Sequence, residues 1–499
     1  MGKIRPTGQK EVTALQWEAL LSAFRLGGPE EMPYDETRYP IGEFEKDYNK
    51  IITSASFRRL QDKTQVFPLE KSDFVRTRLT HSIEVSSLAK RIGSMVIRNI
   101  AAFQQDSGYT LTGEQASSIL DILTCAGLLH DLGNPPFGHF GEVILSDWFT
   151  RHFQDPAFTY KGKAIGTWLT PSMQADLQNF EGNAQTLRIL TKLHPSFHTS
   201  GMNLTAAVLN TLVKYPTDSC HFDKHHSNNK FHKLGYYTAE TAQLTAIAAQ
   251  TGTVIQGEMV RHPLAYILEA ADDIAYATAD LEDAHKKKLF SLQEFMGYYR
   301  SRLAYYASDM TEKQKEKSTS LVEELERQIA ICPSEQTAFQ NWVEYARHWL
   351  AYSAAYGFTS QENYGAIMEG TYTHSILQDT FHQFSMEILQ KDIPSVFIFS
   401  NSSIVKLELA AQTILSALLD RFVPAIFYLD ETAGPFCQTK GDKKLTSLIS
   451  DNYLRSYWNQ RRGVESYDLY LRLLLVTDYI SGMTDSYAKD LYQILQGIY

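Results

Sequence analysis

The sequence has few cysteines and no paired cysteine motif. Its 499 residues include four cysteines, at positions 125, 220, 332 and 437, and none of them forms a CxxC pair. A disulfide framework is therefore excluded, and a reducing compartment is expected. The N-terminal stretch MGKIRPTGQKEV also lacks the apolar core of a signal peptide. We expect a soluble, cytoplasmic protein.

Long apolar runs and an excess of basic residues are also missing. No uninterrupted apolar run approaches the roughly 20 residues of a membrane helix, so no membrane association is expected. The 47 basic and 57 acidic residues give a formal net charge of −10, which argues against a global basic surface for nucleic acid but leaves a local basic groove open. A site for a polyanionic ligand must therefore concentrate Lys and Arg locally.

The phosphate-binding motifs of α/β proteins are absent too. There is no G-x-G-x-x-G after a strand, no GK[ST] and no alternating βαβ pattern. Strand-like alternation is confined to SVFIFSN at 395–401 and TGTVIQGEM at 251–259, which predict short strands or a hairpin. Helical periodicity dominates elsewhere, so we predict a mainly α fold with at most a few short strands.

Several segments carry a clear helical pattern. Apolar residues at helical spacing, with Pro and Gly as terminators, predict helices over 81–100, 117–129, 183–193, 204–214 and 262–284. The charge-rich segment 309–327 predicts a solvated helix, and the His-rich segment 220–233 is interpreted as an insertion. A soft boundary near residue 300 predicts a motif-bearing domain over 1–300 and a helical C-terminal region over 301–499.

The stretch HDLGNPPFGHFGE, residues 130–142, gathers several groups that bind metals or transfer protons. Adjacent His130 and Asp131 would diverge by about 100° on a regular helix, so both can face one ion only where the helix unwinds. Gly133 and the two following prolines supply that break. Each residue alone fits a surface or capping role, but the set H…HD…D formed with His81 and Asp272 is far more specific for a divalent metal.

That set resembles the HD superfamily of metal-dependent phosphohydrolases. The surrounding motifs are similar to those of bacterial deoxyguanosine triphosphate triphosphohydrolases and related dNTPases, and they follow in family order over about 200 residues. They are RRLQDKTQVFPLE (58–70), RTRLTHS (76–82), HDLGNPPFGHFGE (130–142), NFEGNAQ (179–185), KYP (214–216) and EAADDIAYATADLED (269–283). The resemblance implies an HD-domain helical fold with a larger helical C-terminal part.

The resemblance also implies an activity and the residues that perform it. The metal, Mn²⁺ or Mg²⁺, would be held by His81, His130, Asp131 and Asp272, with His139 and Glu142 as the acid/base pair. The substrate would be a deoxynucleoside triphosphate, with dGTP as the preferred one, split by water attack at the α-phosphorus into deoxynucleoside and tripolyphosphate. The spacing of three between His139 and Glu142 places them on one face if a helical turn begins after Pro136.

Substrate-binding residues follow from position and from the resemblance. Arg78 precedes His81 by three and Lys214 ends a helix, so both cations can point into a phosphate site. Asn134 can donate to a phosphate or simply form the turn. The resemblance assigns Tyr276 to stacking, Asp280 and Gln65 to the deoxyribose 3′-hydroxyl, Val66 to the 2′ position, and Asn183 and Tyr215 to the rest of the cleft.

Other interpretations remain open at this stage. One is an HD phosphohydrolase acting on a different nucleotide, and another is a binding protein regulated by nucleotides or single-stranded DNA, with secondary catalysis. The resemblance further implies a homo-oligomer, often a hexamer, and a nucleotide or single-stranded DNA effector, with base recognition partly in the C-terminal region. The His-rich segment 220–233 could bind zinc by composition, but its spacing matches no zinc template, which favours a solvated loop near the cleft.

Overall fold

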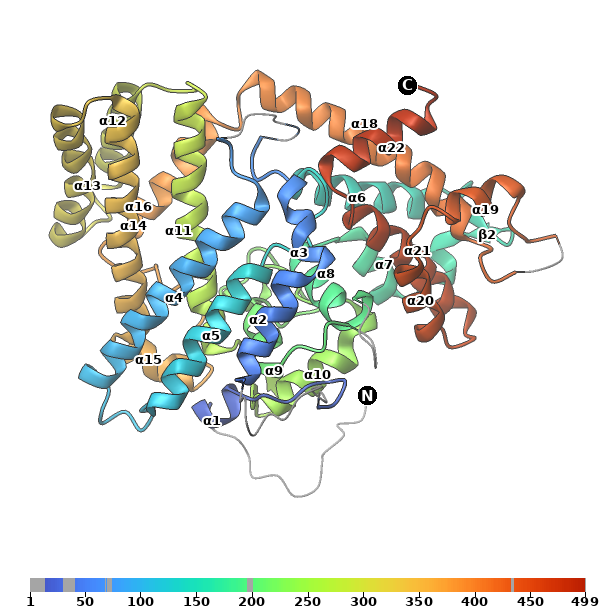
Figure 1. Ribbon diagram of the computed structural model, residues 1–499, viewed down its shortest axis with the longest axis horizontal. Helices are drawn as coiled ribbons and strands as arrows, with labels where there is room; N and C mark the ends of the chain where they lie inside the picture. Colours follow the sequence, from blue (N-terminus) through green and yellow to red (C-terminus); the bar gives the residue numbers. More distant parts are fainter. Residues whose placement is uncertain are drawn as a thin grey trace.

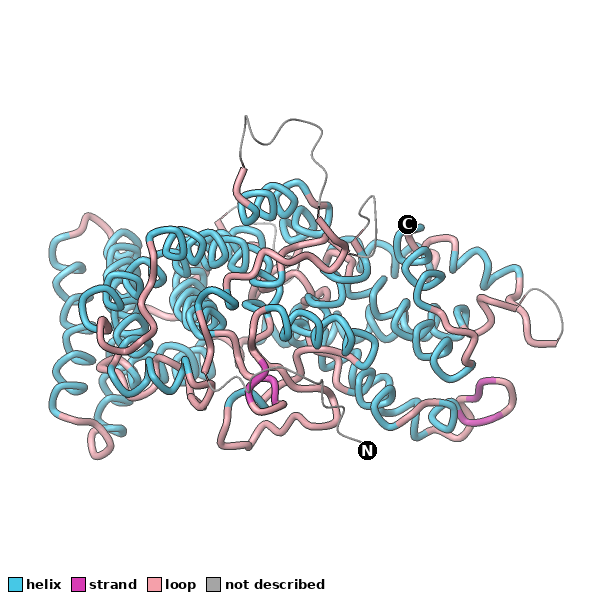
Figure 2. Tube along the Cα trace, turned by 90° about the horizontal axis from the view of Figure 1, so that it is seen from below, coloured by secondary structure: helices cyan, strands magenta, loops and turns pink. Residues whose placement is uncertain are grey.

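The computed structural model describes residues 14–29, 41–67, 69, 74–194, 201–431 and 435–498. Most of this part of the chain is helical, which confirms the predicted mainly α fold (Figures 1 and 2). The N-terminal stretch that lacks a signal-peptide pattern lies outside the described residues.

The helices succeed one another with few interruptions. In the first half they are α1 (Trp17–Leu20), α2 (Glu43–Thr53), α3 (Ala55–Arg59), α4 (Arg78–Phe103), α5 (Gly113–Leu129), α6 (Gly138–Gln154), α7 (Pro171–Gln178), α8 (Gly182–Arg188), α9 (Ala206–Leu212), α10 (Thr241–Gln250) and α11 (Pro263–Lys286). In the second half they are α12 (Leu292–Tyr306), α13 (Glu312–Ile331), α14 (Glu335–Thr359), α15 (Gln361–Met368), α16 (Gln383–Glu387), α17 (Ile393–Phe397), α18 (Ser402–Ile426), α19 (Lys440–Thr446), α20 (Asp451–Gln460), α21 (Glu465–Ser481) and α22 (Asp485–Leu495).

Two small hairpins are the β-structure of the described residues. The strands are β1 (Thr159–Tyr160), β2 (Lys163–Ala164), β3 (Val254–Ile255) and β4 (Glu258–Met259), and each consecutive pair is antiparallel. Both hairpins lie along the same side of the molecule (Figure 2). The hairpin predicted at 251–259 is confirmed.

The strand predicted at 395–401 is wrong. This segment forms the end of α17 and the turn after it. Pro394 stands in the first turn of α17, where its fixed φ favours a helix and its missing N–H costs nothing. Its carbonyl then accepts N–H groups from both Ile398 and Phe399, each at 2.9 Å, which closes the turn. Local apolar content without regular alternation was therefore a poor indicator of a strand.

The core around the HD motif is built by α4, α5, α11 and α14, which pack against one another (Figure 1). Thr77 caps α4 in a reciprocal capping box with Thr80, which fixes where this helix begins. Close approach of α4 and α5 requires Gly127, because a Cβ there would lie 2.4 Å from the Cα of Ser86. Helix α14 follows the predicted boundary near residue 300 but packs on α4 and α11, which precede that boundary, so both parts of the chain share this core. The boundary itself stays a prediction.

The last helices cover the other end of the molecule. Helix α18 runs across the top of Figure 1 and packs against α6, α21 and α22. Its stretch Ile404–Ile426 is long and apolar enough to span a membrane by length and composition, a property shared by core helices, and half of it is buried within the protein. The buried helix α21 also packs against α7 and α20.

Candidate active site

Four side chains from three parts of the fold converge at one point. His81 lies in the first turns of α4, His130 caps the end of α5, Asp131 follows it, and Asp272 belongs to α11. The Nε2 atoms of His81 and His130 each lie 3.3 Å from Asp272 Oδ1. His130 Nε2 is also 3.6 Å from Asp131 Oδ1. The structure thus brings together all four predicted metal ligands.

The chemistry of this cluster fits a divalent metal. His130 Nδ1 lies 2.8 Å from the carbonyl oxygen of Gly127 and donates to it, which leaves the lone pair of Nε2 facing the cluster. That buried Nε2 has no hydrogen-bond partner among the described residues. Although burial opposes it, the Arg78 guanidinium holds the pKa of Asp131 well below its usual range, so this carboxylate is ionised. Two imidazoles and two carboxylates form a suitable donor set.

The turn after the metal ligands redirects the chain into α6. Phe137 has a left-handed backbone with φ 64°, and Gly138 follows with φ 60°. A Cβ at Gly138 would lie 2.6 Å from Arg78 Nη2, so this position excludes a side chain on two grounds. Helix α6 begins at Gly138, and its first turn brings His139 Nδ1 within 2.8 Å of Glu142 Oε2. The predicted juxtaposition of the two residues is therefore present.

The His139–Glu142 pair combines a buried carboxylate with an accessible imidazole. The charge of Glu142 and its hydrogen bond raise the pKa of His139 above its ordinary value. Burial favours the neutral form of Glu142, but the His139 charge outweighs burial and lowers the pKa of Glu142. The N–H of Gly182 donates to the other carboxylate oxygen at 2.8 Å. The side chain of His139 is 69% exposed, so its free nitrogen can reach a ligand.

Fixed cations surround the cluster. Arg78 Nη1 lies 2.5 Å from Asp131 Oδ2, and Lys214 Nζ lies 2.6 Å from Asp272 Oδ2. Each predicted phosphate-binding cation is thus anchored to a metal-ligating carboxylate. A third cation, Lys233, lies 3.5 Å from Glu181 Oε1 at the end of the His-rich segment. Sequence reasoning missed Lys233, because its polar surroundings resemble any solvated loop.

One cavity of about 510 Å³ joins these groups. The predicted residues in its wall are Gln65, Val66, Arg78, His130, Asp131, Asn134, His139, Asn183, Lys214, Tyr215, Asp272 and Tyr276. His81, Glu142 and Asp280 are buried and stand outside the wall. Lining residues that sequence reasoning missed include Phe140, Glu181, Lys233, Glu269, Gln390, Lys391, Phe399, Ile404, Leu407 and Glu408.

Several predicted residues contact the site through polar bonds. Asn134 Nδ2 donates to Asp131 Oδ1 at 2.6 Å, so in this structure it orients a metal ligand. Asn183 Nδ2 donates to Glu181 Oε1 at 2.7 Å. The hydroxyl of Tyr215 donates to Glu269 Oε1 at 3.3 Å.

The two residues assigned to the sugar hydroxyl have unmatched polar atoms. Gln65 Oε1 and Asp280 Oδ2 are buried without a hydrogen-bond partner among the described residues. Asp280 also bonds with Tyr276, and burial together with Asp283 raises the pKa of Asp280 well above its usual range. Unmatched buried polar atoms of this kind suit a ligand hydroxyl.

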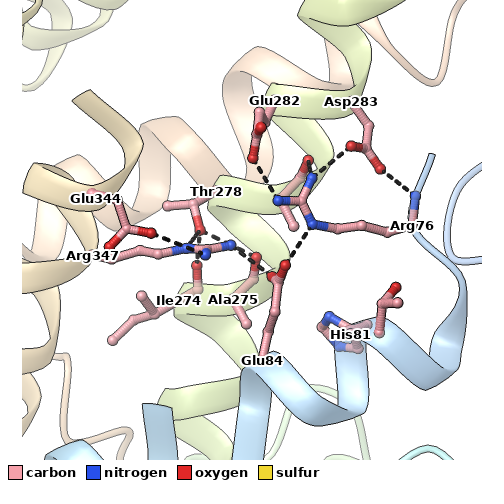
Figure 3. Close-up of polar contacts among 12 residues, drawn as sticks. Arg76, His81, Glu84, Ile274, Ala275, Thr278, Glu282, Asp283, Glu344 and Arg347 are labelled. Atoms are coloured by element: carbon pink, nitrogen blue, oxygen red, sulfur yellow. Dashed lines mark hydrogen bonds and ion pairs between the residues drawn. The ribbon is translucent and has the colours of Figure 1, made fainter. Parts of the chain in front are cut away.

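An ion-pair network fixes the start of α4 relative to α11 and α14 (Figure 3). Arg76 donates to Asp283 at 2.6 Å and to Glu84 at 2.8 Å, and it also contacts Glu282. Arg347 on α14 bonds with Glu84 at 2.8 Å and thereby closes the network. His81 lies beside it on α4, so the network holds the helix that carries a metal ligand against the helix that carries Asp272.

The His-rich segment 220–233 forms a loop with one 3-10 turn. Its His221 bonds with Asp218 at 2.7 Å. Within the described ranges, the group of three or more side chains with metal-binding spacing consists of His81, His130 and Asp131. The segment therefore offers no second metal group of that kind.

Comparison with known proteins places these features in a family. The HD domain family matches residues 78–164, which span α4 to β2. A deoxyguanosinetriphosphate triphosphohydrolase-like protein of Listeria innocua is 44% identical over 462 residues, covering 91% of this chain and 94% of the relative. The chain belongs to the deoxyguanosinetriphosphate triphosphohydrolase family within the HD superfamily. It is accordingly a hydrolase.

Other members of the triphosphohydrolase family match at a similar extent. A triphosphohydrolase-like protein of Synechocystis is 32% identical, covering 97% of this chain and 100% of the relative. A deoxyguanosinetriphosphate triphosphohydrolase of Yersinia pestis is 32% identical, covering 92% of this chain and 95% of the relative. The match to the family therefore includes the C-terminal helices that complete the cavity.

Proposed function

We propose that this protein hydrolyses deoxynucleoside triphosphates, preferring dGTP, to deoxynucleoside and tripolyphosphate with the help of Mn²⁺ or Mg²⁺. The observation that carries the proposal is the cavity itself, where a four-ligand metal cluster, fixed cations and the His139–Glu142 pair meet. The names of the relatives support a triphosphate substrate and a guanine preference.

Each group has a role that follows from its position. His81, His130, Asp131 and Asp272 would hold the metal, which supplies Lewis acidity toward a phosphoryl oxygen and makes water more acidic. Arg78, Lys214 and Lys233 neutralise the triphosphate and fix its position.

Proton transfer is assigned to His139. Water attacks the α-phosphorus, one phosphorus–oxygen bond forms and the bond to the sugar 5′-oxygen breaks. The proton that the attacking water loses restores the protonated imidazole of His139 after that group has protonated the leaving oxygen. Since Nδ1 of His139 is held by Glu142, Nε2 faces the substrate and donates a proton to the departing 5′-oxygen. The products are the deoxynucleoside and an intact tripolyphosphate.

The sugar end of the cavity favours a deoxyribose. The unmatched Gln65 Oε1 can accept the proton of the 3′-hydroxyl, and the Asp280 carboxyl, whose raised pKa favours the protonated form, can donate to the hydroxyl oxygen. Val66 lines the cavity beside Gln65 and would crowd a 2′-hydroxyl. Ribonucleotides are therefore expected to react more slowly.

Product analysis tests the proposal. Incubation with dGTP and Mn²⁺ should yield deoxyguanosine and tripolyphosphate in equal amounts, whereas dGMP with pyrophosphate would contradict cleavage of the bond between the α-phosphorus and the sugar 5′-oxygen. Replacing His130 by Ala removes one buried ligand, so metal binding measured by calorimetry and turnover should both be lost. Turnover that persists without bound metal would contradict the assigned metal site.

Two alternative functions are tested by further measurements on the same protein. A substrate panel containing nucleoside monophosphates, cyclic dinucleotides and guanosine tetraphosphate tests whether another nucleotide is preferred. The four cationic side chains in the cavity wall, Arg78, Lys214, Lys233 and Lys391, favour a polyphosphate over nucleoside monophosphates and cyclic dinucleotides. A nucleic-acid effector is tested by binding of single-stranded DNA at increasing salt, because phosphate-driven binding weakens steeply with salt.

A further inference from the structure

The end of α21 is tied to the turn that follows the metal ligands. Lys63 Nζ donates to the carbonyl oxygen of Asn134 at 2.6 Å and to that of Ser481 at 2.7 Å. Lys63 is buried, with 2% of its surface exposed. One ammonium group therefore links the HD turn to a helix that lies far away in the sequence.

Asp485, the first residue of α22, makes a second link. Its Oδ1 accepts the N–H of Phe137 at 2.9 Å. Its Oδ2 accepts both the N–H of Thr64 at 3.0 Å and the hydroxyl of Thr64 at 2.5 Å. The residue is 1% exposed, so these bonds form away from competing water.

The two residues whose amides Asp485 binds both line the cavity. Phe137 immediately precedes α6 and adopts a left-handed backbone, which is unfavourable for a residue other than glycine and needs surrounding contacts to hold it. Thr64 precedes Gln65 and forms a β-bridge with Thr77, next to Arg78. One carboxylate thus joins the turn that directs His139 to the segment that carries the sugar and phosphate contacts.

We propose that Asp485 is a positioning residue for catalysis. It touches no substrate but holds the backbone of Phe137 and Thr64, so that His139 and the phosphate-binding groups face the same bound nucleotide. Lys63 supports the same arrangement from the Asn134 side of the turn. The kinetic test of this role rests on the proposed function, whereas the test by amide hydrogen exchange does not.

The kinetic test is Asp485→Asn. The amide keeps one acceptor and turns an NH₂ group toward a backbone N–H, which leaves a donor facing a donor. We expect kcat for dGTP to fall roughly tenfold to a hundredfold, because misplaced acid catalysis is lost, while KM changes by less than about threefold. Metal binding measured by calorimetry should be unchanged, since the four ligands stay intact.

A matched control separates positioning from simple stability. Asp468 is also a buried aspartate, and it accepts the N–H groups of Arg462 and Gly463 at 2.8 Å each, near the far end of α21. Asp468→Asn should lower the melting temperature but leave kcat within about twofold, because a helix of this length puts the site roughly 20 Å away. If both variants lose stability and both keep kcat, the positioning role is overturned.

A milder variant covers the case in which Asp485→Asn fails to fold. Thr64→Val removes only the hydroxyl donor and preserves the side-chain shape, so kcat should fall a few-fold at unchanged KM. If Asp485→Asn folds, the double variant Thr64→Val/Asp485→Asn should have a kcat no lower than that of Asp485→Asn alone, since both changes act through one contact. Additive losses would contradict action through Thr64.

Amide hydrogen exchange gives a readout that needs no turnover. Peptides containing Thr64 and Phe137 should be protected in the wild-type protein and exchange at least about tenfold faster in Asp485→Asn, but not in Asp468→Asn. If the wild type fails to hydrolyse any deoxynucleoside triphosphate, the proposed function fails while this experiment still tests the link. Unchanged exchange at both peptides would overturn the inference.

Discussion

The charge state of His139 depends mainly on Glu142. Replacing Glu142 by Gln removes the charge that raises the pKa of His139 and leaves the charges of Lys233 and Arg78 to lower it. Because the protonated imidazole is the proposed acid, the alkaline limb of the kcat–pH profile should move to lower pH, and kcat should fall at least about tenfold. Steady-state rates across the neutral range check this, and an unmoved limb would contradict the acid role.

The same pair sets a window of pH-dependent stability. Because folding raises the pKa of His139, the protonated imidazole stabilises the fold, and this stabilisation is lost as pH rises through the pKa of His139 in the folded protein. Because folding lowers the pKa of Glu142, the ionised carboxylate stabilises the fold, and this stabilisation is lost as pH falls through the pKa of Glu142 in the folded protein. The pair therefore contributes most between those two values. In Glu142→Gln the melting temperature should depend less on pH at the two edges of this window, where the wild-type protein loses the stabilisation.

Lys233 tests the third phosphate contact. We expect Lys233→Ala to raise KM for dGTP about tenfold to a hundredfold, the loss of one hydrogen bond to a charged group, with a smaller effect on kcat. Lys224, exposed in the same segment, is the matched control, and Lys224→Ala should leave KM unchanged. Equal effects of the two variants would show that only the general charge of the loop matters.

Local motifs determined which site residues could be predicted. The metal ligands and the His139–Glu142 pair stand in short patterns with defined spacing, and the structure brings them together. Glu408 and Lys233 line the same cavity but stand in segments without such a pattern. The roles assigned to these residues stay predictions until the variants are measured.

At the scale of secondary structure, periodicity was reliable for long helices. The segments around 81–100, 117–129 and 262–284 are helical, as predicted, because regular apolar spacing and strong caps agree there. The charge-rich segment 309–327 is also mostly helical, but α13 buries Leu321 and Leu325 rather than being solvated all round. Short apolar runs were less reliable, since tertiary packing decides between a strand and a helical turn.

Packing between helices can be tested with two glycines. Gly127→Ala would place a Cβ 2.4 Å from the backbone of α4, so we expect a loss of about 1 to 3 kcal/mol in the free energy of unfolding. Gly297→Ala makes the same change within α12, where a Cβ meets nothing within 4 Å, and should stabilise by about 0.4 to 1 kcal/mol. Thermal denaturation compares the two, and a Gly127→Ala protein at least as stable as the wild type would contradict the close contact of α4 with α5.

At the scale of the whole molecule, exposed apolar residues suggest assembly. Val396, Phe399, Val405 and Leu409 are each more than two-fifths exposed near the mouth of the cavity. Such clusters are uncommon on monomers. We expect a homo-oligomer, with a hexamer of about six times the 56.7 kDa chain mass, measurable by light scattering. Leu409→Glu should shift the distribution toward smaller species, and a monomeric wild type would contradict the expectation.

Contacts across the whole chain were beyond prediction from the sequence. Arg188 on α8 pairs with Asp478 on α21 at 2.7 Å and with Glu240 at 2.8 Å, all three buried. The local sequence around each of these residues does not indicate its partner, because the pairing depends on how distant helices pack together. The tertiary support of the site was therefore visible only in three dimensions.

The link between Asp485 and Phe137 has a consequence for biosynthesis. The ribosome makes Asp485 348 residues after Phe137. At roughly 5 to 20 residues per second, Asp485 is therefore synthesised about 17 to 70 seconds after the turn at Phe137. If Asp485 positions His139, a nascent chain that already contains every metal ligand cannot yet catalyse hydrolysis. Nucleotide pools would then be spared from unfinished copies of the enzyme, and hydrolysis would begin only when α22 has docked.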